Sequence, residues 1–247
     1  MNINLAGKLR ASTAKAHTMA ENSAFMKCFQ KGVIKQETFR KFTACLYFIY
    51  SALEEELQRH KDDDVIGLIY FPEIDRRQNL EEDLTFYYGE NWREQINLIP
   101  ECKEFVDRIR EVASNDLPLL VAHSYVRYMG DLSGGQALKN LARSYMSLPE
   151  DKGTRFYEFD ALNSIEAIKA FKDRYRNALN SLPVDEETAQ KIADEAIKVF
   201  TLNMNTMHGL EDEVKAALDE QTFAEIVSKV TPGSTENNPQ EEMVTSK

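Results

Sequence analysis

The sequence has 247 residues, of which 43% are hydrophobic and 10% aromatic, which is ample for a buried core and argues against general disorder. The formal net charge of −11 makes nucleic acid and anionic membranes poor candidates as main partners. No apolar run approaches the roughly 18 residues of a membrane span and no secretory signal opens the chain, so we expect an intracellular protein without a membrane anchor.

Apolar residues recur at three- and four-residue steps along the first half of the chain, which is typical of amphipathic helices. The predicted helices cover residues 3–20, 24–30, 36–60, 80–88, 92–96 and 101–113. Within the longest of them we expect Glu54, Glu55 and Glu56 to face solvent. The three cysteines form no CxxC pair and are expected to be free thiols in the core.

The stretch 119–141 has helical periodicity but contains three glycines close together. Each interior glycine costs a helix about 1 kcal/mol relative to alanine. Gly130 and Gly134 are four residues apart and share a face, with Asp131 beside them. This pattern predicts a helix that is kinked, or bared so that something flat or bulky can lie against its backbone. Close packing of a second helix is an equally good explanation from spacing alone.

Residues 149–163 are polar with an aromatic patch and are expected to form an ordered loop. Further helices are predicted from Ser164 to Leu179 and from Asp185 to about Leu218, the latter bent near Gly209. The prediction is therefore a single all-α domain over residues 1–222, with about eight helices, and a polar, disordered tail over residues 223–247.

Of the four histidines, His60 and His208 are expected at the surface and His123 in a structural role. His17 lies among small residues, and Glu21 follows one turn later on the same face, where its carboxylate could orient an imidazole that binds metal. No HExxH or Cys/His cluster accompanies it. A lone histidine is more often structural than a ligand. If it is a ligand, heme fits better than a bare ion, because the porphyrin supplies four ligands itself.

Four separated motifs together resemble the heme oxygenase family: KAHTMAEN around His17, LYFIYSALEEEL around Tyr50, YFPEIDR at 70–76 and AHSYVRYMGDLSGGQ in the glycine-rich stretch. The resemblance runs from about Leu5 to Leu218 and is strongest to the soluble enzymes of cyanobacteria and algal plastids. It implies a multi-helix fold in which heme is sandwiched between a proximal helix that carries the iron ligand and a kinked, glycine-rich distal helix.

The resemblance also implies roles for individual residues. His17 would be the axial iron ligand, with Glu21 as its neighbour, and Asp131 would order the distal waters that deliver protons. Gly130 and Gly134 would let the distal backbone approach the porphyrin. The remaining implied residues are Arg10, Tyr125, Lys172 and Arg176 at the propionates, Tyr50, Arg127 and Asn203 near the distal waters, and Phe200 in the pocket wall.

The implied reaction cleaves heme, which is both cofactor and substrate, with O2 and external electrons to biliverdin IXα, CO and Fe2+. The resemblance points to ferredoxin as the electron donor, to a bilin reductase as a downstream partner, and to the cyanobacterial cytoplasm or the plastid stroma as the location. Because ferredoxins are acidic, docking would need a local basic patch. The cations at the propionate edge, with Lys139 and Arg143, are the expected patch.

Three alternatives remain. A non-catalytic heme-binding or heme-trafficking protein on the same scaffold would need His17 but not Asp131. A thiaminase-like or di-iron protein on a related bundle would need a catalytic cysteine or carboxylate–histidine clusters, neither of which the sequence displays. A helical interaction domain would leave the three glycines unexplained.

Overall fold

The computed structural model describes residues 3–234, and every regular element within them is helical, as predicted. The long helices are α1 (Leu5–Glu21), α3 (Gln36–Arg59), α5 (Arg77–Tyr88), α6 (Pro100–Asn115), α7 (Leu120–Met146), α8 (Ile165–Asn180) and α9 (Glu186–His208). The short ones are α2 (Ala24–Gln30), α4 (Ile66–Ile69), α10 (Glu211–Ala216) and α11 (Glu220–Ser228), with 3-10 turns η1 (Pro72–Ile74), η2 (Trp92–Glu94), η3 (Leu117–Leu119) and η4 (Arg155–Tyr157).

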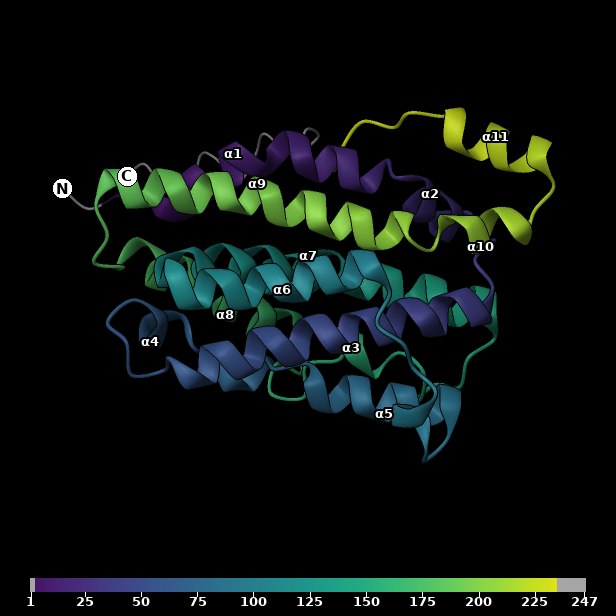
Figure 1. Ribbon diagram of the computed structural model, residues 1–247, viewed down its shortest axis with the longest axis horizontal. Helices are drawn as coiled ribbons and strands as arrows, with labels where there is room; N and C mark the ends of the chain where they lie inside the picture. The colour runs from purple at the N-terminus through teal and green to yellow at the C-terminus, as the bar shows by residue number, and fades with distance from the viewer. Residues whose placement is uncertain (1–2, 235–247) are drawn as a thin grey trace.

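The long helices form layers (Figure 1). Helices α1 and α9 pack along each other on one side, α6, α7 and α8 lie in the middle, and α3 with α5 covers the far side. Because α7 contacts α2, α3 and α9, a ligand held against α7 can be reached from several directions. None of the helices within residues 3–234 is long and apolar enough to cross a membrane.

Local sequence signals explain where many helices begin. The side chains of Ser23, Ser164, Asp185 and Asp219 each accept a hydrogen bond from the backbone N–H three residues later. These contacts satisfy N–H groups that the first turn of a helix leaves unpaired. Pro100 opens α6, where its missing N–H costs nothing.

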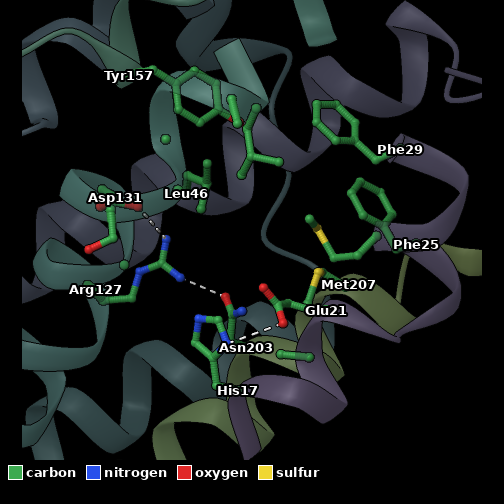
Figure 2. Close-up of a pocket in the computed structure, with 18 of the residues that line it drawn as sticks. His17, Glu21, Phe25, Phe29, Leu46, Arg127, Asp131, Tyr157, Asn203 and Met207 are labelled. Carbon is green, nitrogen blue, oxygen red and sulfur yellow. Dashed lines mark hydrogen bonds and ion pairs between the residues drawn. The ribbon is translucent and has the colours of Figure 1, made fainter. Parts of the chain in front are cut away.

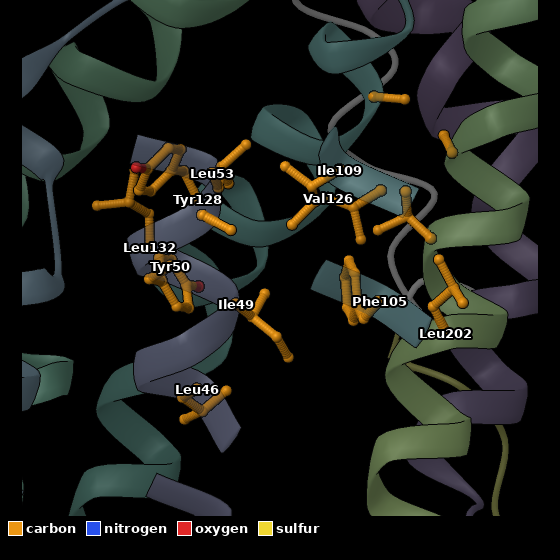
Figure 3. Packing of buried hydrophobic residues seen from close by; sticks show 14 of the residues in the cluster. Leu46, Ile49, Tyr50, Leu53, Phe105, Ile109, Val126, Tyr128, Leu132 and Leu202 are labelled. Carbon is orange, nitrogen blue, oxygen red and sulfur yellow. The ribbon is translucent and has the colours of Figure 1, made fainter. Parts of the chain in front are cut away.

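The core lies between the middle layer and the helices on either side of it (Figure 3). Leu46, Ile49, Tyr50 and Leu53 of α3 meet apolar side chains from three other helices. These partners are Phe105 and Ile109 of α6, Val126, Tyr128 and Leu132 of α7, and Leu202 of α9. The three cysteines are free and buried, as predicted. This core fixes α3 and α7 side by side, which places Tyr50 next to Asp131.

The prediction that the carboxylates of Glu54, Glu55 and Glu56 on α3 face solvent is wrong for two of the three. Glu54 and Glu56 are only 7% and 4% exposed. Glu54 accepts hydrogen bonds from the backbone N–H groups of Arg76 (2.5 Å) and Arg77 (3.2 Å), where α5 begins. It therefore caps α5 from a distant point in the chain. A carboxylate in that position is stabilised by the unpaired N–H groups of the first turn.

The C-terminal part also differs from the prediction. The last long helix, α9, ends at His208 rather than near Leu218, and α10 and α11 follow as separate helices. The predicted boundary at residue 222 falls inside α11, so residues 223–228 are helical. The Lys27 ammonium donates to the carbonyl of Val227 at 2.7 Å, which fastens α11 to α2. Residues 229–234 form no helix, and residues 235–247 of the predicted tail lie outside the described residues.

Candidate functional site

A cavity of about 600 Å³ opens between α1, α2, α3, α7, α9 and the loop after α7. This volume is typical of small-molecule sites. His17, Glu21, Arg127, Asp131 and Asn203 are polar residues that line it (Figure 2). The remaining walls are mostly apolar and include Phe25, Phe29 and Met26 of α2, Leu46 of α3, Phe156 and Tyr157 of η4, and Phe200 of α9.

His17 is placed on the cavity wall by α1. Its ring meets Phe200 of α9 edge to face, with the ring centroids 5.7 Å apart. The buried Nδ1 atom makes no hydrogen bond, and Glu21 Oε2 lies 3.5 Å from it. A carboxylate beside one ring nitrogen favours the tautomer that leaves the other nitrogen free to bind a metal. The predicted pairing of His17 with Glu21 is therefore present.

A neighbour of Glu21 that the sequence did not indicate is Ser234. Its backbone N–H and hydroxyl donate to the two carboxylate oxygens of Glu21, at 2.9 and 2.5 Å. Nearby, the backbone N–H and carbonyl of Thr231 pair with the Asn22 side chain, both at 2.9 Å. The chain after α11 thus crosses the end of α1, and Ser234 lines the cavity. No local pattern marks a polar segment as docking here, so sequence reasoning missed it.

The glycine-rich part of α7 forms the opposite wall, and the helix continues through it without a break. A Cβ atom placed on Gly130 or Gly134 would meet nothing within 4 Å. Both glycines line the cavity, so bare backbone faces open space rather than a neighbouring helix. The explanation by close helix packing at these two positions is therefore wrong. The third glycine, Gly135, lies against Tyr157 instead.

Asp131 is held in a buried hydrogen-bond network with residues from three helices. The Tyr50 hydroxyl donates to Asp131, and Arg127 Nε donates to that hydroxyl at 3.1 Å. Arg127 Nη1 also donates to Asn203 Oδ1 at 2.7 Å, and Nη2 lies 3.9 Å from the Asp131 carboxylate. All four predicted distal residues are thus brought together. Only Tyr50 does not itself line the cavity.

The burial of this network shifts the pKa values of its members. Burial raises the pKa of Asp131 above its usual value, although Arg127 and the Tyr50 hydrogen bond act in the opposite direction. Burial raises the pKa of Tyr50 much further, so its hydroxyl stays protonated and acts as a donor. Asp131 is therefore a carboxyl group that can take up a proton more readily than an exposed aspartate.

The residues predicted at the propionates form a separate group outside the cavity lining. The positive charges of Arg10 on α1 and Arg176 on α8 both act on the Tyr125 hydroxyl, although burial raises its pKa overall. Lys172 lies one helical turn before Arg176, and Arg176 Nη1 pairs with Asp173 at 2.9 Å. The structure thus brings Arg10, Tyr125 and Arg176 together, as the family resemblance implies.

Lys139 and Arg143 do not form the open basic patch that was predicted. Both contact Glu158, with Lys139 Nζ at 2.7 Å and Arg143 Nη2 at 3.2 Å from Oε1. Both side chains are held by Glu158 and are only 15% and 22% exposed, which weakens them as docking residues.

The other histidines are explained without a ligand. His123 is fully buried, and its Nε2 lies 3.0 Å from Glu195 Oε1, while Arg108 holds the other oxygen of Glu195. Burial lowers the pKa of His123, so it is a neutral structural residue between α7 and α9, as predicted. His208 is exposed and pairs with Glu211, and His60 is half-buried near Glu56 rather than fully at the surface.

The site fits heme better than a bare metal ion. Within residues 3–234, no group of three His, Cys, Asp or Glu side chains could hold an ion. One histidine faces a cavity with apolar walls, and two glycines on the opposite wall leave space where side chains would stand. A planar macrocycle that brings its own four ligands needs only such an axial histidine and such a bare surface.

Comparison with known proteins agrees with this geometry. The family described as "Heme oxygenase" matches residues 3–209. "Heme oxygenase 2" of Synechocystis is 52% identical, over 94% of this chain and 93% of that protein, and "Heme oxygenase" of Porphyra purpurea is 44% identical, over 85% and 88%. The crystal structure of Synechocystis heme oxygenase-2 in complex with heme and NO superposes with a TM-score of 0.94 at 51% identity and covers 96% of this chain and 97% of that one.

Proposed function

The chain belongs to the heme oxygenase family, and we propose that it binds heme through His17 and cleaves it oxidatively to biliverdin IXα, CO and Fe2+. The observation that carries the proposal is that His17 and the Asp131 network line the same cavity. A protein that only binds heme needs His17. An enzyme that also transfers protons during the reaction needs the Asp131 network as well.

The proposed roles of the site residues differ between the proximal and distal sides of the bound heme. Heme, when bound, supplies the iron that activates dioxygen and the ring that is oxidised. On the proximal side, Glu21 would fix the imidazole of His17 so that Nε2 is the ligand atom. On the distal side, Gly130 and Gly134 would allow the backbone of α7 to lie against the porphyrin.

Asp131 would hold and pass on the protons that the reaction consumes. The Asp131 carboxylate accepts from Tyr50, and Arg127 contacts both Tyr50 and Asn203. The position of Asp131 is therefore fixed before substrate binds. The raised pKa of Asp131 brings its carboxyl closer to the range where protons are exchanged near neutral pH. We infer that it orders water in the part of the cavity that it lines.

A non-catalytic heme carrier on the same scaffold is the second candidate. Such a protein would have no use for a buried carboxyl group in the cavity, because burial of a charge costs free energy unless partners satisfy it. The chain devotes Tyr50, Arg127 and Asn203 to that network. This favours the enzyme.

Electrons would come from a reduced partner, and we infer an acidic ferredoxin in the cyanobacterial cytoplasm or plastid stroma, with a bilin reductase as consumer of the product. We assign docking to Arg10, Lys172 and Arg176, the cations that the family resemblance places at the edge of the ligand. Electrostatic attraction of this kind accelerates association and weakens with salt.

Replacement of Asp131 tests the enzymatic role separately from binding. The Asp131→Ala protein should bind hemin with an affinity within about threefold of the parent, because the axial ligand is intact, but lose at least about 100-fold in biliverdin formation. Hemin titration and product absorbance measure the two quantities. Turnover equal to that of the parent would remove Asp131 from the mechanism.

A further inference from the structure

The half of α7 that follows the glycines is less buried than the half before them. Residues 136–146 are mostly half-buried or exposed, although Ala142 is buried and Leu138, Leu141 and Met146 pack against the core. Polar contacts also fasten this half of the helix. Gln136 Nε2 donates to the carbonyl of Tyr157 at 2.8 Å, and Arg143 Nε donates to Thr154 Oγ1 at 3.0 Å. Both contacts lead to the loop between α7 and α8.

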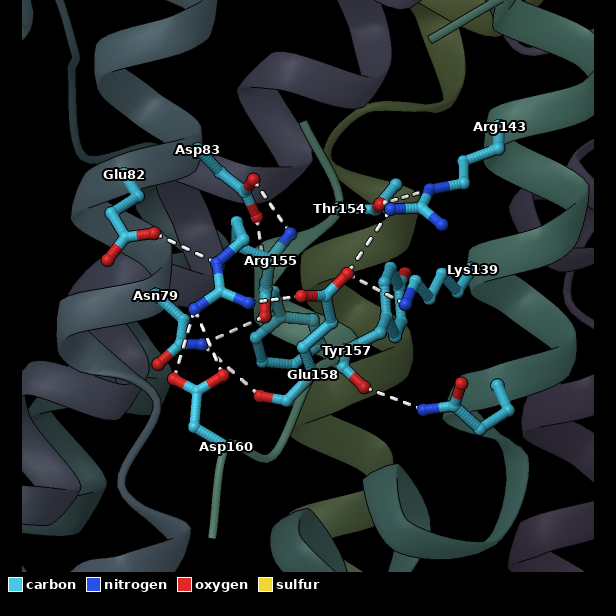
Figure 4. A network of polar contacts seen from close by, with 12 residues as sticks. Asn79, Glu82, Asp83, Lys139, Arg143, Thr154, Arg155, Tyr157, Glu158 and Asp160 are labelled. Atoms are coloured by element: carbon cyan, nitrogen blue, oxygen red, sulfur yellow. Dashed lines mark hydrogen bonds and ion pairs between the residues drawn. The ribbon is translucent and has the colours of Figure 1, made fainter. Parts of the chain in front are cut away.

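Glu158 is the centre of these contacts (Figure 4). One carboxylate oxygen accepts from Lys139 and Arg143 of α7, and the other accepts from Arg155 of the same loop. Lys139 and Arg143 are one helical turn apart, so a single carboxylate holds two successive turns of the helix. Burial acts to raise the pKa of Glu158, but Lys139 and Arg155 outweigh it and keep this pKa below its usual value.

The loop itself is fixed to the far side of the molecule. The Asp83 carboxylate of α5 accepts from the backbone N–H groups of Arg155 and Phe156, both at 2.8 Å. Asn79 donates to the carbonyls of Arg155 and Glu158 at 3.1 and 3.2 Å. The loop is therefore held firmly against α5, and α7 is attached to the loop through ion pairs.

The attachment controls the cavity because both partners line it. Phe156 and Tyr157 form part of its wall, and so do Gly134, Ala137, Leu138 and Leu141 of α7. A shift of this half-helix away from the loop would open the cavity at the glycines, where the helix resists bending least.

We propose that Glu158 is a positioning residue that latches the post-glycine half of α7 to the loop carrying Phe156 and Tyr157, and so sets how tightly the cavity closes on its ligand. The identification of that ligand as heme rests on the proposed function, but the latch itself does not. Ion pairs of this kind can break and re-form without unfolding the core, which suits a wall that must admit a substrate and release a product.

The test compares Glu158→Gln with Asp160→Asn. Both remove one carboxylate that pairs with Arg155, but Asp160 is exposed and contacts Arg155 from the solvent side. In the protein without hemin, Glu158→Gln should accelerate amide hydrogen exchange about tenfold across residues 136–146, and leave α1 and α3 unchanged. Asp160→Asn should leave amide hydrogen exchange unchanged, both across residues 136–146 and in α1 and α3.

The same pair of variants is then loaded with hemin. Glu158→Gln should release hemin about tenfold faster, while its absorption spectrum still shows a histidine ligand. Lys139→Gln should reproduce the effect, and the double variant should add little to either single one. Exchange across residues 136–146 that matches Asp160→Asn would overturn the latch. Failure of the unaltered protein to bind hemin would instead overturn the proposed function.

Discussion

At the scale of single residues, the site depends on pairs in which one group fixes another. Glu21 lies beside His17 and is itself held by Ser234, and Arg127 holds both Tyr50 and Asn203 around Asp131. Each reactive group therefore has few orientations left before a ligand arrives. Such preorganisation reduces the reorganisation that a reaction must overcome.

Replacement of His17 tests the proximal assignment. His17→Ala should lose the absorption spectrum of a histidine-ligated heme, because no second histidine among residues 3–234 lines the cavity. His208→Ala is the matched control, since that histidine is exposed and outside the cavity, and it should keep the spectrum of the parent. A His17→Ala spectrum that matches the parent would place the ligand elsewhere.

Some of these residues could be predicted from their spacing in the sequence, and others could not. Spacing alone suggested His17 with Glu21, and the glycines with Asp131. Tyr50, Arg127 and Asn203 came from the family resemblance, because they lie on three helices and no spacing connects them. Ser234 was missed altogether. Glu54 was placed in solvent because three consecutive carboxylates usually mark an exposed face, and its partners, the N–H groups of Arg76 and Arg77, are visible only in three dimensions.

At the scale of elements, α7 combines two properties that usually exclude each other. It is an unbroken helix over 27 residues, yet it carries glycines where alanine would stabilise it. Open space lies beside Gly130 and Gly134, and under the proposed function heme would occupy it against the bare backbone. Helix periodicity predicted the element well, whereas the break of the last long helix at Gly209 into α9 and α10 was predicted only as a bend.

Gly134→Ala separates stability from binding. The added methyl group should raise the free energy of unfolding of the ligand-free protein by up to about 1 kcal/mol, since it meets no neighbour and improves helix propensity. The same methyl group should weaken hemin binding about tenfold or more, because it projects into the cavity. Thermal unfolding and hemin titration measure the two effects. Unchanged affinity would show that the glycine is not needed for close approach.

At the scale of the whole molecule, buried charges link the site to the rest of the fold. Burial and the nearby Asp75 raise the pKa of Glu54 to about 8, and burial raises the pKa of Asp75 to about 6. Tyr128 bridges the two carboxyl groups at 3.4 and 3.5 Å and packs against Tyr50. The layer between α3, α5 and α7 is thus sensitive to pH.

The sign of this sensitivity follows from the pKa of Glu54. Unfolding restores its ordinary pKa of 4.5, so between pH 4.5 and about 8 the native state binds more protons than the unfolded state. The free energy of unfolding should therefore fall as pH rises through this range, by up to about 1.4 kcal/mol per pH unit from this one group.

Denaturant unfolding across pH 5–8 measures the effect. Glu54→Gln should flatten the slope, because the amide does not titrate and its one oxygen can still accept from the backbone N–H of Arg76. Glu55→Gln, on the exposed face of the same helix, is the control and should leave the slope as it is in the parent. Equal slopes in all three proteins would rule out Glu54 as the source of the pH dependence.

The most direct measurement of the central claim is a single reaction. The full chain is loaded with one equivalent of hemin and supplied with O2 and reduced ferredoxin while its visible spectrum is recorded. We expect the Soret band to disappear, biliverdin absorbance to rise, and one equivalent each of CO and Fe2+ to be released. A Soret band that persists with heme bound and reduced would contradict the account and identify the protein as a heme carrier.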